Sequence, residues 1–110
     1  MTIDFLSKEY KAILNFNGGE GTFFAKIVDD GVNKIICGML EPGSSIGMHC
    51  HETSAEIIFV VSGNGTVKTP NGDETVSAGQ CSYCKKGDSH SLCNTGDEDL
   101  HFYAVVPQFG

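Results

Sequence analysis

Short runs of apolar and β-branched residues, separated by turn residues, make up most of the chain after residue 21. Runs of about four to eight residues between regular turn signals are typical of the strands of an antiparallel sandwich or barrel. No segment of helical length separates them, which argues against a parallel sheet built from strand–helix–strand units. We therefore predict an all-β domain with strands near residues 22–28, 34–40, 56–61, 66–69, 74–77, 81–84, 90–93 and 100–106.

The first residues follow a different pattern. Apolar side chains recur at roughly helical spacing behind Asp4, a candidate N-cap, at Ile3, Leu6, Tyr10, Ile13 and Leu14. This pattern fits a short amphipathic helix and an extended arm equally well, and the glycine-rich residues 17–21 then end it. We predict an N-terminal arm over residues 1–21 and a β-barrel domain over residues 22–110, as a single domain overall.

Composition and charge limit the classes of function. A chain of 110 residues supports one hydrophobic core, and its net charge of −7 argues against a nucleic-acid partner. All seven cations are lysines, so no arginine can bind a carboxylate or phosphate through paired hydrogen bonds. No apolar run approaches the ~20 residues of a membrane span, and the first residues do not resemble a signal peptide. Five scattered cysteines indicate reduced thiols and a cytoplasmic location.

Two histidines two residues apart, His49 and His51, are the first candidate for chemistry. In an extended segment alternate side chains share a face, so the two imidazoles lie about 7 Å apart on the same side. A turn through residues 53–55 brings Glu56 back toward them as a third ligand. Imidazole and carboxylate suit a divalent metal such as iron, manganese, nickel or zinc.

A second half-site follows downstream, and together the two stretches resemble the paired motifs of the cupin family. The fixed places of the first motif are filled by Gly43, His49, His51, Glu56 and Gly63. Those of the second are filled by Gly79, Gly87, His90 and Asn94. The departure is Lys85, which stands where the second motif usually has a proline. That proline stiffens a loop and does not touch the metal, so its loss affects loop rigidity more than ligation.

This resemblance implies a conical jelly-roll barrel, or double-stranded β-helix, with one divalent metal ion inside it. The implied ligands are His49, His51, Glu56 and His90. Three imidazoles and one carboxylate leave two positions of a six-coordinate ion open to water, O₂ or a chelating molecule. Iron, manganese or nickel is the favoured ion, and zinc is a further candidate.

The cysteines form a rival pattern, because Cys81 and Cys84 have the CxxC spacing of redox and zinc sites. Residues three apart in a strand face opposite sides, however, so these two cannot chelate or bridge while the strand is regular. Cys50 is expected to face away from an ion that both neighbouring histidines bind. Cys84 is expected near the metal, and it joins Tyr83 and Tyr103 as a candidate catalytic or substrate-binding group.

Three apolar residues are expected to form the walls of the substrate pocket. Ile58 and Val60 share the strand face of Glu56, and Leu92 shares that of His90. The predicted pocket is therefore apolar, with the metal as its main polar feature.

The family does not fix the reaction. We expect a metal-dependent enzyme, an oxygenase or a lyase or isomerase, acting on a small polar molecule that coordinates the ion. The missing arginine argues against an oxalate-type decarboxylase and against phosphate-gripping isomerases. The alternative is a non-catalytic module that binds or senses a small molecule through its metal. By analogy with small cupins we expect a homodimer paired through the outer face of one sheet, with Phe23, Phe24 and Phe59 as candidate contacts.

Overall fold

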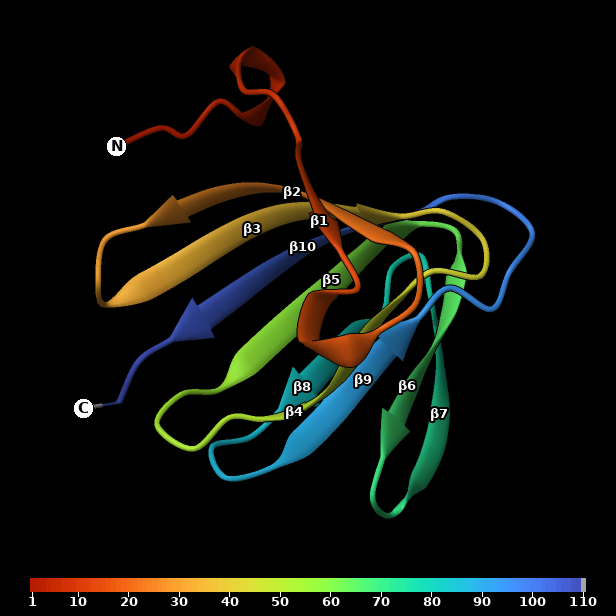
Figure 1. Ribbon diagram of the computed structural model, residues 1–110. Coiled ribbons are helices and arrows are strands. Elements are labelled where there is room, and N and C mark those ends of the chain that lie inside the picture. The colour runs from red at the N-terminus through yellow and green to blue at the C-terminus, as the bar shows by residue number, and fades with distance from the viewer. Residues whose placement is uncertain (110) are drawn as a thin grey trace.

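Two facing β-sheets form the molecule in the computed structural model, which describes residues 1–109 (Figure 1). Two 3₁₀ helices, η1 (Phe5–Ser7) and η2 (Phe16–Gly18), lie in the N-terminal segment. Within residues 1–109 no helix is long and apolar enough to cross a membrane. The strands are β1 (Lys11–Leu14), β2 (Thr22–Asp29), β3 (Asn33–Leu40), β4 (Ser45–Cys50), β5 (Glu56–Ser62), β6 (Asn64–Thr69), β7 (Gly72–Ser77), β8 (Cys81–Cys84), β9 (Ser89–Cys93) and β10 (Leu100–Pro107).

Strand pairing confirms the predicted antiparallel all-β jelly roll. The larger sheet has the order β1-β2-β3-β10-β5-β8, and the smaller has the order β4-β9-β6-β7. The chain crosses between the sheets at turns such as Gly63, where φ is +91°. A side chain at that position would also overlap the Asp99 carbonyl, so this turn requires glycine.

The core lies between the sheets and follows the strand alternation. On β10 the inward residues Leu100, Phe102 and Ala104 are each at most 2% exposed, whereas Tyr103 between them is 43% exposed. Phe102 stacks on Phe23 with ring centroids 6.0 Å apart. Burial of a large apolar side chain is worth roughly 1.5–3 kcal/mol. The core cluster to which they belong also includes Ile46, Val67, Val76 and Leu92 of the smaller sheet, so apolar packing holds the two sheets together.

The N-terminal segment is an extended arm and not an amphipathic helix. Asp4 caps only the single turn of η1, where its Oδ1 accepts a hydrogen bond from the Leu6 amide at 3.0 Å. β1 then pairs with the edge of β2, with Ile13 opposite Phe23. A helix would need a buried apolar face, but Leu6 is 93% and Leu14 71% exposed, and backbone pairing with β2 prevails.

Two further expectations stay predictions. The five cysteines are free thiols, but this does not test a cytoplasmic location. The boundary at residues 21 and 22 matches the start of β2 but is not tested as a domain limit. The last residue of the predicted domain, Gly110, lies outside the described residues.

Candidate metal centre

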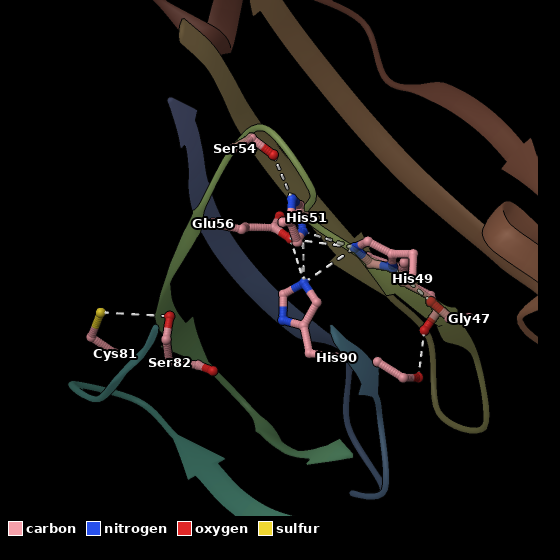
Figure 2. Close-up of polar contacts among 10 residues, drawn as sticks. Gly47, His49, His51, Ser54, Glu56, Cys81, Ser82 and His90 are labelled. Atoms are coloured by element: carbon pink, nitrogen blue, oxygen red, sulfur yellow. Dashed lines mark hydrogen bonds and ion pairs between the residues drawn. The ribbon is translucent and has the colours of Figure 1, made fainter. Parts of the chain in front are cut away.

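Four side chains from three strands and one loop converge inside the barrel (Figure 2). The Nε2 atoms of His49, His51 and His90 are each 3.1 Å from the other two. Glu56 Oε1 lies 2.7 Å from the nitrogen of His90, 3.2 Å from that of His51 and 3.7 Å from that of His49. Four nitrogen and oxygen donors that face one another at these distances could hold one metal ion.

A β-bulge in β4 aims His49 at this point. Ile46 pairs with Leu92 and His49 pairs with His90, so three steps on β4 match two on β9. Both Ile46 and His49 face the interior, although residues three apart in a regular strand face opposite sides. The extra residue lies around Gly47 and Met48, and Met48 is 48% exposed. Regular alternation of side chains along the strand does not predict this shift, whereas a glycine within a strand pattern, here Gly47, is a known sign of a bulge.

The N-terminal arm packs against the bulge and fixes its backbone. A Cβ at Gly47 would overlap the carbonyl of Asn17, and one at Gly19 would overlap the carbonyl of Ser45. The Ser45 amide also donates to the Glu20 carbonyl at 2.8 Å. His49 Nδ1 in turn donates to the Gly47 carbonyl at 2.7 Å. The arm therefore supports the strand segment that orients this histidine.

The turn before β9 holds His51 through its backbone. The Gly87 amide donates to the His51 carbonyl at 2.6 Å, and the His51 amide donates to the Asp88 carbonyl at 3.0 Å. The Asp88 amide closes the turn on the carbonyl of Lys85 at 2.9 Å, and φ at Gly87 is +90°. The turn thus forms without the usual proline. Lys85 and Lys86 are both exposed.

The protonation pattern of the rings fits a metal site. A carbonyl only accepts, so the Nδ1 of His49 carries the hydrogen and the neutral ring turns a lone pair at Nε2 toward the cluster. His51 Nδ1 bonds Ser54 Oγ at 2.8 Å, a partner that the sequence motif did not reveal. His90 Nδ1 is buried without a partner in the described residues. Donors about 2.0–2.2 Å from a common ion are separated by about 2.8–3.6 Å, close to the spacing found here.

The electrostatics of the cluster keep its carboxylate ionised. Burial opposes the charged form of Glu56, but in the metal-free site hydrogen bonds from His49, His51 and His90, when these rings carry a proton at Nε2, outweigh burial and hold the pKa of Glu56 well below the usual range. Burial likewise opposes a proton on His49, yet its bonds to Glu56 and to the Gly47 carbonyl leave the pKa raised. Protons and a metal ion therefore compete for the same nitrogen. A divalent ion beside one carboxylate retains a net charge of +1.

The candidate catalytic groups divide between the inner and outer faces. Cys84 lies opposite Glu56 on β8 and is 5% exposed, and burial followed by the charges of Asp88 and Glu56 raises the pKa of its thiol to about 11. Tyr103 lies on the outer face of the larger sheet, away from the cluster, and we assign it no role there. Tyr83 is 60% exposed and only borders the cavity described next.

The thiols of Cys81, Cys84 and Cys50 lie on the faces expected from strand alternation. Cys81 is exposed whereas Cys84 is buried, so the CxxC pair does face opposite sides of β8. Cys50 is exposed, and its Sγ lies 3.6 Å from the Gly87 carbonyl and so turns away from the histidines.

A cavity of about 340 Å³ reaches His90, and its lining differs from the apolar one predicted. Ile58, Val60 and Leu92 do face inward, but they are 1%, 4% and 1% exposed and belong to the packed core. Leu92 pairs with Val67 on the smaller sheet, and all of these residues belong to the one buried apolar cluster, so their side chains are already covered. The cavity is bordered instead by mostly polar residues of β8, the turn before β9 and the β6–β7 hairpin: Thr69, Pro70, Asn71, Glu74, Ser82, Tyr83, Cys84, Gly87, Asp88, Ser89 and His90.

Several known proteins are similar to this chain. An oxalate-binding protein of Thermotoga maritima is 42% identical over 67 residues, which are 61% of this chain and 55% of that protein. The match thus spans about half the length of that relative. The crystal structure of a predicted oxalate decarboxylase from Thermotoga maritima is 30% identical with a TM-score of 0.91, over 98% of this chain and 99% of the other.

More distant structures share the fold alone. A sugar phosphate isomerase from Silicibacter pomeroyi has a TM-score of 0.81 and 20% identity, over 98% of this chain and 76% of the other. KdgF from Halomonas has a TM-score of 0.79 and 16% identity, over 98% of this chain and 94% of the other. Residues 38–106, which contain His49, His51, Glu56 and His90, match the cupin domain family Cupin_2. Together with the jelly-roll architecture, this match shows that the chain belongs to the cupin family.

Proposed function

We propose that this protein holds one divalent metal ion through His49, His51, Glu56 and His90 and uses it to bind a small chelating carboxylate. The observation that carries the proposal is the convergence of three imidazole nitrogens and one carboxylate oxygen at 2.7–3.7 Å from one another. Iron, manganese or nickel is the favoured ion, with zinc as a further candidate. The ion would act as a Lewis acid with two positions free for the ligand.

The ligand class rests on similarity and on charge. The relative that is 42% identical over 67 residues is named an oxalate-binding protein, and this similarity supports a carboxylate ligand here. The chain has no arginine, and no lysine borders the cavity within residues 1–109. The attraction for an anion would therefore come from the ion, whose net charge beside Glu56 is +1.

A metal-dependent enzyme, an oxygenase or a lyase or isomerase, is the second candidate. Its specific support is that Asp88, Glu74 and Cys84 border the same cavity as His90. Carboxylates and a protonated thiol beside an ion are groups that can transfer protons to or from a bound molecule.

Metal analysis and calorimetry test the two candidates together. Protein purified without chelator is expected to carry about one ion per chain and to bind oxalate only when loaded. Metal affinity is expected to fall as the pH drops below ~6.5, because imidazoles must be neutral to ligate, and the raised pKa of His49 starts this competition at higher pH. Occupancy near zero would refute both candidates. O₂ consumption or substrate turnover by the loaded protein would favour the enzyme.

We also propose a homodimer that buries the outer face of the larger sheet. Adjacent residues there are apolar and exposed, with Phe59 49%, Val61 53% and Tyr83 60% exposed. Of the contacts expected from the sequence, Phe59 belongs to this patch and Phe24 is half-buried on the same sheet. Phe23 is 2% exposed in the core and is not available.

Light scattering tests the dimer. Phe59→Lys is expected to halve the molar mass in solution, because a charge would be buried at the centre of the apolar patch. Val32→Lys serves as the control, since Val32 is 59% exposed in the β2–β3 turn, outside the patch. A monomeric wild-type protein would contradict the proposal.

A further inference from the structure

Glu74 lies on the inner face of the barrel and borders the same cavity as His90, but it is not one of the four residues of the metal cluster. On β7 it pairs with Val67 of β6, and two residues along Val76 pairs with Gly65. Val67 and Val76 are 3% and 4% exposed in the core, so the strand alternation places Glu74 on the core-facing side. Glu74 is itself exposed, which puts it at the open end of that face.

The carboxylate of Glu74 borders the cavity that reaches His90 and has no partner there. Within residues 1–109 its side chain makes no hydrogen bond or ion pair, and it shares the cavity with the hydroxyl of Ser82, which also has no side-chain partner in that range. Ser82 faces inward because it pairs with Ile58, which is 1% exposed. Asp88 adds a second carboxylate to the border of the cavity, and no lysine within residues 1–109 is among the residues that border it.

These charges have opposite consequences for the two ends of a bound molecule. The end that reaches the ion meets a net positive charge. The end that points to the cavity border meets carboxylate oxygens, which accept hydrogen bonds and repel a second anionic group. A hydroxyl group at that end can donate a hydrogen bond to the carboxylate of Glu74, whereas a carboxylate there would place two like charges in a partly enclosed space.

We propose that Glu74 is a specificity-determining residue, and that the site selects hydroxylated monocarboxylates over ligands with a second, free carboxylate. The inference rests on the proposed metal-dependent binding of a chelating carboxylate. It concerns only the part of the ligand beyond the chelate. Oxalate can use both of its carboxylates to chelate, so it has no such part and reports on the ion alone.

2,4-Dihydroxybutyrate and malate form a matched pair of probes for calorimetry on manganese-loaded protein. Both present the same 2-hydroxy acid, which closes a five-membered chelate ring on the ion, whereas the two carboxylates of malate could close only a less favoured seven-membered ring. The distal group is therefore CH₂OH in 2,4-dihydroxybutyrate and a free carboxylate in malate. Glu74→Gln is expected to tighten malate binding by about three- to tenfold, because a like charge nearby is removed, and to weaken 2,4-dihydroxybutyrate binding by a few-fold. Glu74→Asp keeps the charge and is expected to keep the wild-type preference.

Asp73→Asn is the matched control, because it removes the same charge from the next residue. Asp73 is exposed and pairs with Lys68, on the opposite face of β7, so both affinities are expected to stay within about twofold of wild type. An affinity ratio unchanged by Glu74→Gln, or changed as much by Asp73→Asn, overturns the inference. Metal content and oxalate affinity are measured first on each sample. A wild-type protein that holds no metal or does not bind oxalate refutes the proposed function. A wild-type protein that passes both tests, followed by an unchanged affinity ratio in Glu74→Gln, refutes only the role of Glu74.

Discussion

Replacement of His51 by alanine is expected to remove the bound metal ion, with a loss of affinity of more than about 100-fold. His51 is 9% exposed, and its Nε2 lies 3.1–3.2 Å from donor atoms of His49, His90 and Glu56. Removal of this ring takes away one of the four donors. Mutation of a residue that only hydrogen-bonds to a metal ligand typically lowers metal affinity by about 10- to 100-fold, so loss of a direct ligand should lower it further.

Cys50→Ala is the control for this prediction, because the two residues are adjacent and have opposite orientations. Cys50 is exposed, and its thiol points to the Gly87 carbonyl and not to the cluster. Metal content by elemental analysis and affinity by competition with a chelating dye should therefore be unchanged. The ligand assignment would be wrong if His51→Ala kept full occupancy, and the orientation of β4 would be wrong if Cys50→Ala lost it.

The strand pattern and the motif spacing predicted most of the molecule. The run at residues 81–84 coincides with β8, and the other predicted strands agree with the observed ones to within about two residues at each end. The alternation rule also predicted that Cys81 and Cys84 would separate to opposite faces. Such success is expected where local pattern and tertiary packing favour the same conformation.

The remaining features depend on contacts between distant segments, and one sequence does not reveal these. The β-bulge at Gly47 lies where the N-terminal arm, which carries Asn17 some thirty residues earlier in the chain, packs on β4. The polar cavity arises because Ile58 and Leu92 are covered by side chains from facing strands, whereas Glu74 lies at the open end. The arm is extended because an unpaired edge of β2 accepts its backbone hydrogen bonds.

Asn94 is expected to support the fold and not the metal, although it belongs to the same motif as His90. It is 2% exposed, and its side-chain amide donates to the carbonyls of Leu40 and Glu98, both at 2.8 Å. Its Oδ1 accepts from the Gly96 amide at 3.0 Å. These three bonds join the end of β3 to the loop between β9 and β10.

Asn94→Ala is therefore expected to lower the free energy of unfolding by about 2 kcal/mol, because it takes a partner from the buried Leu40 carbonyl and breaks two partly buried hydrogen bonds, at roughly 0.5–1.5 kcal/mol each. Urea unfolding of the metal-free protein measures this, with Asn64→Ala as the control, since Asn64 is exposed. A loss below ~1 kcal/mol would contradict the structural role. The variant should still bind metal while folded, since Asn94 is not among the four residues of the metal cluster. His51→Ala and Asn94→Ala would then separate ligation from support of the barrel, two roles that the spacing of the motif residues does not distinguish.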